Sequence, residues 1–311
     1  MKKNIILCLS AILLCATIHA QDTTATDELP ANYTTKGFKF GITVGVYWAN
    51  KYTASLYDGY GLDYQGHRNE FSNSLIYNKI WNEYGGHYNS GQIDQIAQAL
   101  NVDPNTWTFK ESDMPVNMKY TPAFQIGLNA RYGVDDKNAI ILNVNACKLI
   151  INGNFTIVTT VQSNQNQLNA GVHTYPIKGG EQRMMFQFGY SRILGDNPRL
   201  NFLLEGGLDA TLAKYDKNLI EINTLLIDLT SSYQQTGQYY NTGQPGYTTL
   251  NSKHLRGIGF GAFASAGIHI TMSPKWTLQL AYNPTYEKIS IGLAPKLKLQ
   301  HAVGIRMYYN F

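Results

Sequence analysis

The sequence predicts an all-β fold, an eight-stranded, antiparallel, up-and-down barrel that spans a membrane. Three observations predict it: the chain opens with an export-type pattern, eight later segments alternate between apolar and polar residues, and the connections between them are alternately short and long. The alternation matters because successive side chains of a strand point to opposite faces. Each such segment therefore has one apolar and one polar face.

The first 20 residues have the pattern of a secretory signal peptide. Lys2 and Lys3 precede an apolar run over 5–16, and Ala20 is a small residue at a suitable cleavage position. The run is shorter than the roughly 20 apolar residues that a membrane-spanning helix needs. We therefore expect 1–20 to be removed, 21–36 to form a short periplasmic segment, and 37–311 to form an outer-membrane barrel domain.

Composition excludes several classes of function. Without the two charges of Lys2 and Lys3, the formal net charge falls from +4 to +2, and nucleic-acid binding needs a clustered basic face. Cys147 is then the only cysteine, which excludes an internal disulfide and thiolate zinc frameworks. No metal-ligand spacing or cofactor motif stands out, so no metal and no cofactor is expected. The mean hydropathy of −0.25 leaves a soluble β-sandwich as the alternative, but the polar half of alternating strands lowers this average in barrels too.

Each alternating segment has about the length that crosses a bilayer as a tilted strand, around ten residues. In the first segment Phe38, Phe40 and Ile42 share one face, and the last segment ends the chain on Phe311. The eight segments are 38–48, 120–132, 140–150, 184–193, 200–212, 258–272, 276–286 and 301–311.

The connections add independent information. Three are tight and rich in Gly, Asp, Asn and Pro, which favour turns: 133–138, 195–199 and 273–275. The other four are long: 50–118, 151–182, 214–256 and 288–300. Strict alternation of short and long connections is typical of an even-stranded barrel with short periplasmic turns and long outer loops. A count of ten strands stays open if 155–161 joins the wall.

The opening Gly37-Phe38-Lys39-Phe40-Gly41, the eight segments and the terminal Tyr309-x-Phe311 resemble the PorT-like and OmpX/OmpW-like small outer-membrane barrels. The resemblance covers 37–311 as an architecture. It implies that the barrel-assembly machinery reads Tyr309 and Phe311 during biogenesis. It also implies an accessory role in secretion or envelope assembly, although the long helical first loop departs from the shortest members.

Charged residues are expected in the lumen. An eight-stranded barrel is just wide enough for its own side chains to fill, and an isolated buried charge costs several kcal/mol. We therefore expect Arg131 and Arg306 to pair with Glu205 and Asp209 in a polar plug; the alternative is a charged constriction that selects solutes. The residues predicted to point inward are Lys39, Arg131, Glu205, Asp209, His269 and Arg306.

The first long loop predicts a helical hairpin over 74–101. Apolar residues recur at helical spacing in its first half, before a Gly-Gly stop, and in a second helix expected after Ser90. The two helices either pack on each other and on the barrel rim, or use their apolar face to bind a partner. The candidate partner contacts are Tyr77, Trp81 and Ile96, and Ile93 is expected on the second helix.

The third long loop leaves two interpretations open. Residues 219–229 suit a short helix and an extended strand equally well, and 231–250 suit either an adaptable recognition surface or a solvated loop. A catalytic site would need a nucleophile, a base and an orienting group at the rim. The available residues are His173, His254 and His301, with Ser252, Ser290 and Glu287, and they form no lipase signature.

Three functional hypotheses follow. The first is a non-catalytic structural or accessory component, embedded in outer-membrane lipid, whose outer loops bind an envelope protein or a glycan. The second is passive transport of a small or amphipathic solute through the barrel. The third is a lipid-modifying enzyme of the outer leaflet. An open lumen would favour the second hypothesis, and a Ser–His contact at the rim would favour the third.

Overall fold

The computed structural model describes residues 36–63, 66–87, 92–160, 171–229, 256–292 and 294–310. The expected signal peptide, most of the expected periplasmic segment, Ser90, 231–250, Ser252, His254 and Phe311 therefore lie outside the described residues. The long strands are β1 (Gly37–Trp48), β4 (Ala123–Gly133), β5 (Asn138–Thr159), β6 (Gly171–Leu194), β7 (Leu200–Ile222), β9 (Arg256–Thr271), β10 (Trp276–Tyr282), β11 (Thr285–Ser290) and β12 (Leu297–Asn310).

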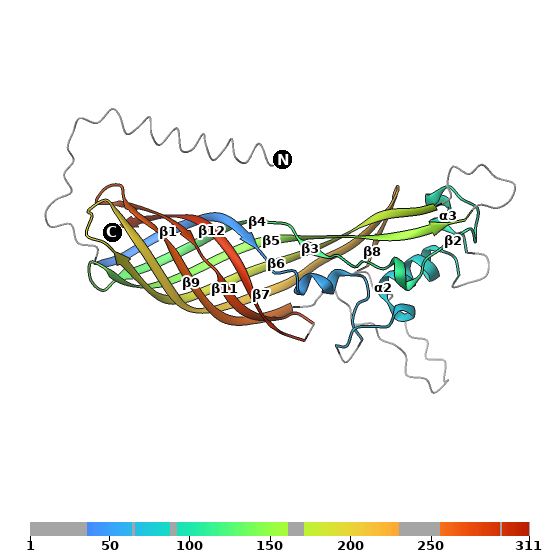
Figure 1. Ribbon diagram of the computed structural model, residues 1–311, viewed down its shortest axis with the longest axis horizontal. Helices are drawn as coiled ribbons and strands as arrows, with labels where there is room; N and C mark the ends of the chain where they lie inside the picture. The colour runs from blue at the N-terminus through green and yellow to red at the C-terminus, as the bar shows by residue number, and fades with distance from the viewer. Residues whose placement is uncertain are drawn as a thin grey trace, which may run out of the picture. The chain divides into compact units, whose positions relative to one another are not determined.

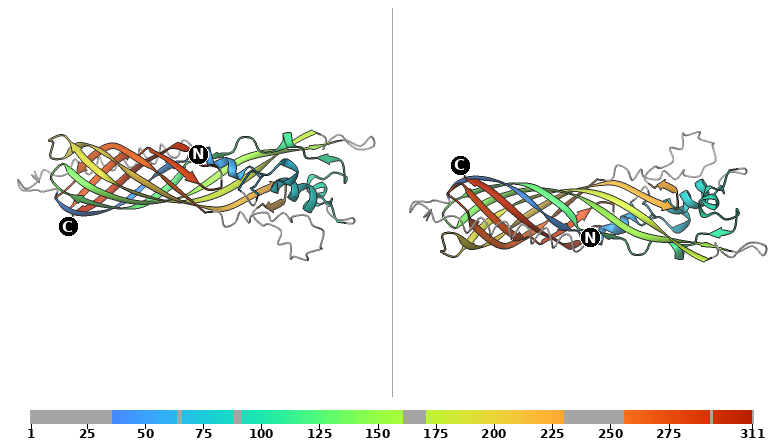
Figure 2. Two further views of the ribbon diagram at one scale, coloured as in Figure 1. Left: turned by 90° about the horizontal axis from the view of Figure 1, so that it is seen from below. Right: turned by 90° about the horizontal axis from the view of Figure 1, so that it is seen from above.

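The strands form antiparallel ladders that return to their starting point (Figures 1 and 2). From β12 the ladders lead through β1, β4, β5, β6, β7 and β9 to β10 and β11, and both of these pair with β12. β10 and β11 are two parts of one expected strand, interrupted at Asn283 and Pro284. Proline cannot donate to a ladder, but Asn283 still exchanges backbone hydrogen bonds with Ala302 at 2.8 and 3.1 Å.

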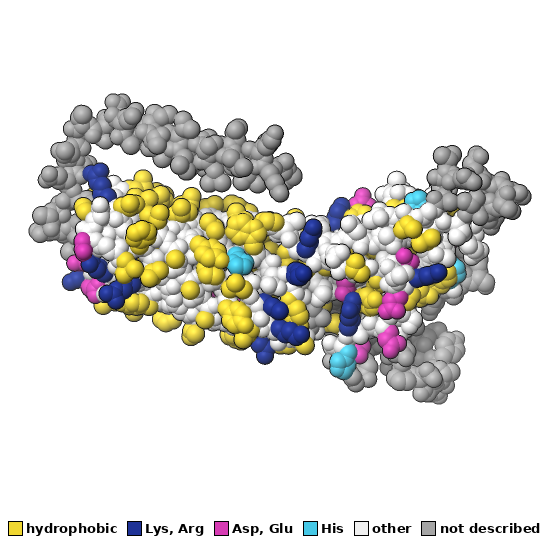
Figure 3. All heavy atoms as spheres, viewed as in Figure 1, with side chains coloured by type: hydrophobic (Ala, Val, Ile, Leu, Met, Phe, Trp, Pro, Cys, Tyr) yellow, Lys and Arg dark blue, Asp and Glu magenta, His cyan; other side chains and the backbone are white. Residues whose placement is uncertain are grey.

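The two faces of the sheet have the polarity that the alternation predicts. Outward side chains such as Phe40, Leu128 and Leu208 are exposed, whereas inward ones such as Asn143 and Gln187 are buried. Exposed apolar side chains occur on all the wall strands and cover the face of the barrel that Figure 3 shows; we call this surface the belt. A sandwich would bury its apolar face, so this inverted arrangement is that of a membrane barrel. No helix in the described part of the chain is long and apolar enough to cross a membrane.

Three strands are much longer than expected. β5, β6 and β7 have 22, 24 and 23 residues, about twice what a bilayer requires. The predicted loops 151–182 and 214–256 are therefore wrong over 151–159, 171–182 and 214–222. The ladder continues there because apolar residues such as Ile151 and Phe155 remain buried. Phe155 thus extends β5, and 155–159 adds no further strand to the wall.

The first loop and the long ends of β5–β7 share one hydrophobic core, which includes Ile80, Ile96, Trp107, Phe155 and Ile220. We call this assembly the platform: residues 53–63, 66–87 and 92–114 together with 150–159, 171–181 and 215–228. Its short elements are η1 (Thr53–Tyr57), η2 (Phe71–Asn73), α2 (Leu75–Tyr77), η3 (Asn78–Tyr84), α3 (Gln95–Leu100), β2 (Trp107–Thr108), η4 (Glu111–Asp113) and β8 (Leu225–Asp228); β3 (Lys119–Tyr120) follows it.

The helical prediction for the first loop needs one correction. Helical turns run from α2 into η3 as expected, but the second helix begins at Gln95. Asp94 caps it, because its Oδ1 accepts a hydrogen bond from the Ala97 backbone N–H at 2.8 Å. Ile93, expected on the helix face, therefore precedes the helix and is 64% exposed.

The open question about 219–229 is also answered by the structure. The segment is a hairpin in which the end of β7 pairs with β8. Asn223 in its turn has a φ of 51°, a left-handed conformation that asparagine tolerates well. Ile220, Ile222 and Ile227 point into the platform core and Leu226 points out of it. Alternation of period two therefore decides for strands here.

The apolar belt yields a test. Leu128 lies in the middle of β4 and is 67% exposed. We expect Leu128→Arg to destabilise the protein folded in lipid vesicles by about 2–4 kcal/mol, the cost of a cation at the bilayer midplane. Val116→Arg is the matched control, because Val116 is 80% exposed outside the barrel wall. Equal costs for the two variants, measured by urea unfolding from vesicles, would contradict a belt in contact with lipid.

Candidate functional site

The six charged residues predicted to face the lumen are all buried, and three of them form an ion-pair cluster near the short turns. Glu205 on β7 lies between two arginines: Arg306 Nη1 donates to its Oε2, and Arg131 Nη1 lies 3.8 Å from its Oε1. Arg131 Nη1 also donates to Ser191 Oγ at 2.8 Å. These contacts join β12, β4, β7 and β6 across the lumen.

Asp209 does not join this cluster as expected. It lies four residues beyond Glu205 on β7, about 13 Å along a strand, which is beyond the reach of Arg131 and Arg306. Its Oδ2 instead accepts a hydrogen bond from Thr211 Oγ1 at 3.2 Å. Among the described residues, no arginine lies within ion-pair distance of Asp209. A shared inward face therefore does not imply a shared level in the lumen.

The other two charged residues also lie on the lumen wall. Lys39 is directly opposite Arg131 in the ladder between β1 and β4, so two cations occupy one level near the short turns. His269 lies on β9, the strand next to β7, where its Nδ1 is 3.1 Å from Gln279 Nε2. The single carboxylate of Glu205 therefore stabilises the arginines of this cluster.

The middle of the lumen is lined mainly by polar amide side chains. Asn129 Nδ2 donates to Asn143 Oδ1 at 2.7 Å, and Asn283 Nδ2 donates to Gln187 Oε1 at 2.9 Å. A small hollow lies here, lined by Thr43, Gln125, Asn145, Ala281, Asn283, Ala302, Val303, Gly304 and Arg306. Two amide oxygens of its lining, on Asn145 and Asn283, have no protein partner. Such a polar hollow suits bound water.

A second ion pair closes the lumen at the long-loop end, which outer-membrane barrels place outside the cell. Arg183 Nε donates to Glu181 Oε1 at 2.6 Å, and both side chains are fully buried. Arg183 also donates through Nη1 to Tyr47 Oη at 3.1 Å and through Nη2 to Thr53 Oγ1 at 3.0 Å. Tyr120 donates its hydroxyl proton to Glu181 Oε2 at 2.7 Å.

This outer ion pair fixes the first loop to the barrel. Tyr57 at the end of η1 donates to Glu181 Oε2 at 3.2 Å, and its ring stacks on Tyr215 with centroids 4.6 Å apart. Sequence reasoning missed the pair because 151–182 was assigned to a loop. The signal was present: Glu181 and Arg183 continue the inward alternation of Gln187 at steps of two.

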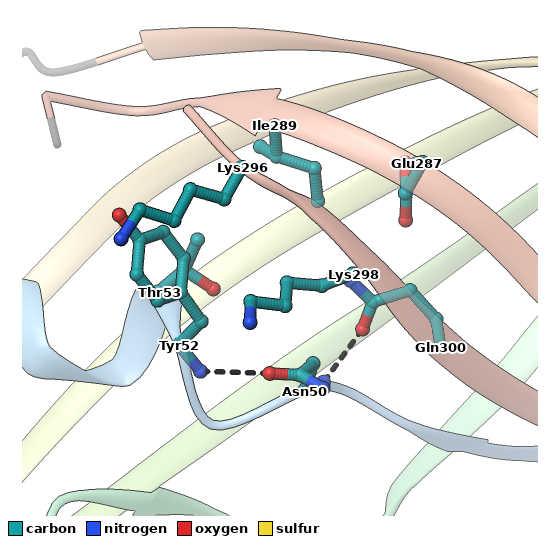
Figure 4. A pocket seen from close by; sticks show the side chains of 8 residues that line it. All are labelled: Asn50, Tyr52, Thr53, Glu287, Ile289, Lys296, Lys298 and Gln300. Atoms are coloured by element: carbon teal, nitrogen blue, oxygen red, sulfur yellow. Dashed lines mark hydrogen bonds between the residues drawn. The ribbon is translucent and has the colours of Figure 1, made fainter. Parts of the chain in front are cut away.

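Beside the Glu181–Arg183 pair, a small hollow lies at the outer mouth of the barrel (Figure 4). Lys296 and Lys298 place their ammonium groups 5.5 and 5.3 Å from the centroid of the Tyr52 ring. Glu287 lies on the lumen side, where its Oε1 accepts from Tyr47 Oη at 3.4 Å. The lining residues are Asn50, Tyr52, Thr53, Glu287, Ile289, Lys296, Lys298 and Gln300. Two cations beside an aromatic ring can bind a small anion.

The described residues form no catalytic triad at the rim. His173 Nε2 lies 2.9 Å from Thr159 Oγ1, and His301 Nδ1 lies 2.6 Å from Tyr282 Oη. Neither histidine is hydrogen-bonded to Ser290 or Glu287 within the described ranges. The same part of the chain contains no group of three His, Cys, Asp or Glu side chains that could hold a metal ion.

The three candidate partner contacts belong to the platform core. Ile96 is fully buried, and Tyr77 and Trp81 are partly buried against it. Trp81 stacks on His87 at 4.0 Å and meets the edge of Trp107 at 5.2 Å. The helices therefore pack on each other and on the long strands.

Of the two residues proposed as an assembly signal, Tyr309 lies on β12. Its ring contacts Trp276 edge-on, with centroids 5.1 Å apart. Phe311 follows the last described residue, so its place beside Tyr309 stays a prediction.

No protein-family model matches this sequence, and no curated protein matches it. Solved structures that match include Neisserial surface protein A (7% identity, TM-score 0.38), the attachment invasion locus protein Ail of Yersinia pestis (9%, 0.32) and outer membrane protein OprG from Pseudomonas aeruginosa (8%, 0.37). They cover 89% of this chain and 99%, 99% and 96% of their own. The architecture of this chain, with exposed apolar side chains outside and polar side chains inside the wall strands, is that of an outer-membrane β-barrel protein.

The Glu181–Arg183 pair can be tested with a double-mutant cycle. Arg183→Met leaves the Glu181 carboxylate buried without its partner, and we expect a loss of about 3–5 kcal/mol in folding free energy. Trypsin should then cleave the first loop of Arg183→Met faster than that of the native protein. Adding Glu181→Gln should recover part of the loss, because the uncompensated charge is removed. Additive costs of the two substitutions in urea unfolding would contradict the pairing.

The first loop also predicts a pH dependence. Asp58 follows η1 and is buried, which raises the pKa of its carboxyl from 3.8 to about 6, although Arg68 opposes this at 2.8 Å. Between these values the folded loop holds a proton that the unfolded chain has lost. The contribution of Asp58 to stability is therefore greatest below pH 3.8 and falls as the pH rises through 6.

We expect the first loop to resist proteolysis better at pH 4 than at pH 7, as measured by quenched digestion after incubation at each pH. Asp58→Asn is the control, since an amide does not titrate and should flatten this difference. A profile that keeps its slope in Asp58→Asn would assign the pH dependence to another group.

Proposed function

We propose that the protein is a non-catalytic, eight-stranded, up-and-down outer-membrane barrel that holds a rigid outer platform for recognition of another envelope component. The observation that carries the proposal is the continuation of β5, β6 and β7 beyond the wall into the core they share with the first loop. A barrel that only spans the membrane has no need of strands about twice the bilayer length.

The filled lumen supports a role at the surface. The Glu205 cluster crosses the lumen near the short turns. Near the long loops, Arg183 is paired with Glu181 on the same strand and reaches across the lumen to Tyr47 and Thr53. Buried ion pairs of this kind hold their geometry, because separating the partners leaves an uncompensated charge. A solute would have to displace both. We therefore rank passive transport second, supported by the polar hollow between the two layers.

The platform suits recognition because its backbone is already ordered. A surface that is rigid before binding loses less conformational entropy when a partner arrives. Its described rim exposes apolar side chains, including Leu226 on the outer strand of the β7–β8 hairpin. An envelope protein or a glycan is the partner class we propose. The accessory role implied by the PorT-like resemblance is one form of it.

Photo-crosslinking in the native outer membrane tests the proposal. A photo-reactive amino acid at Leu226, which is 60% exposed, should yield a discrete protein or glycan adduct identified by mass spectrometry. The matched control at Leu128 in the belt should give only lipid adducts. Absence of an adduct at Leu226, with a monomer recovered in mild detergent, would overturn recognition by the platform.

Planar-bilayer recording separates the transport alternative. A closed lumen should give no large, steady open level in the native protein. Steady conductance would promote transport to first place, and we would then expect Arg183→Met to increase it because the outer ion pair is lost.

A further inference from the structure

The lipid-facing sides of four neighbouring strands change character at the outer end of the apolar belt. On β7 the outward series Leu204, Leu208 and Leu212 is followed by Lys214. On β5, β6 and β9 the outward side chain likewise changes from apolar to polar or charged within two residues. The pairs are Ala146 and Lys148 on β5, Met184 and Gln182 on β6, and Ile258 and Arg256 on β9.

These four polar residues are consecutive neighbours across the ladders. Lys148 is opposite Gln182, Gln182 is opposite Lys214, and Lys214 is opposite Arg256. Side chains opposite one another in antiparallel strands have Cβ atoms about 4.5–5.5 Å apart, and like charges in such pairs are destabilising. A bound anion would relieve the repulsion between Lys214 and Arg256.

A β-bulge adds a further cation. The register between β6 and β7 shifts between Gly180 and Glu181, which places Lys217 opposite Gly180. A Cβ at Gly180 would lie 3.0 Å from Lys217 Cγ, so glycine allows this side chain to lie across the strand. The bulge thus places Lys217 over Gly180, one outward position beyond Gln182 on β6.

In the described part of the chain, only one carboxylate contacts these outward polar residues on β5, β6, β7 and β9. Asp216 Oδ2 is 3.0 Å from Lys148 Nζ, and its Oδ1 is 3.5 Å from Gln182 Nε2. Within the described ranges, no carboxylate lies at ion-pair distance from Lys214, Lys217 or Arg256, and all three are exposed. Figure 3 shows basic side chains gathered where the apolar belt ends.

We propose that Lys214, Lys217 and Arg256, with Gln182 beside them, bind a phosphate group of an outer-leaflet lipid. A guanidinium can hold two phosphate oxygens at once and lysines add point charges. Leu212 and Ile258, the next outward residues toward the membrane, contact the acyl chains of the same lipid. Free inorganic phosphate shares the headgroup chemistry but not this apolar contact. The proposal requires the barrel to lie in the membrane and is independent of platform recognition.

The test uses the full-length mature protein and bisphosphorylated lipid A as probe, with bound lipid counted by native mass spectrometry in a neutral detergent. The triple variant Lys214→Gln, Lys217→Gln, Arg256→Gln should bind lipid A roughly a hundredfold more weakly, because it removes three cations that attract the anionic headgroup. The matched control is Lys36→Gln, Arg192→Gln, Lys275→Gln, which removes the same charge at the short-turn end and should retain binding.

Three outcomes would overturn the proposal. Equal loss in both triple variants would show a response to net charge alone. Equal affinity of the native protein for dephosphorylated lipid A would assign binding to the acyl chains. Displacement of lipid A by millimolar inorganic phosphate would make the site one for free phosphate.

Thermal stability provides a second measurement. Lys214→Gln should unfold at the same or a higher temperature in neutral detergent, because it relieves the repulsion from Arg256, and yet bind lipid A more weakly. Lower stability together with unchanged lipid binding would assign Lys214 a purely structural role and contradict the proposal.

Discussion

The ladder between β1 and β12 is the interaction on which the rest of the structure depends. Within a lipid bilayer every backbone N–H and C=O needs a partner inside the protein, and an open sheet edge leaves a row of them unpaired. Pairing the first long strand with the last removes that edge over the register from Lys39–Asn310 to Trp48–His301. The same pairing sets which side chains face lipid and which are enclosed.

Closure has an energetic consequence for the interior. Polar and charged side chains enclosed by the wall lose bulk water and must find partners in a narrow space. They do so in layers, with Glu205 between two arginines at one end and the Glu181–Arg183 pair at the other. The outer layer reaches beyond the wall to Thr53 and Tyr57, so the charge balance of the lumen also orders the first loop.

Much of the fold could be predicted because period-two alternation is a direct consequence of strand geometry. It identified the wall strands and the buried positions of Lys39, Arg131 and Arg306. It could not show where the bilayer ends, since residues 151–159 keep the same period while facing a platform core. Nor could it predict the position of each inward residue along the barrel axis, which is why Asp209 was expected beside Glu205. The phosphate-site candidates needed the register, because Gln182 and Arg256 are far apart in sequence and come to the same level only through Lys214 on the strand between them.

The hydrogen bonds of Arg183 join residues that are far apart in the sequence. Tyr47 precedes Arg183 by 136 positions and Thr53 precedes it by 130, so neither has its partner until β6 has formed. The loop-closure entropy of such distant contacts is lost before any of them stabilises the structure. Platform and barrel consequently form a single cooperative unit. The first loop should therefore not keep its fold when transplanted to another barrel. Its surface can change during evolution only as long as the buried Glu181–Arg183 pair beneath it is kept.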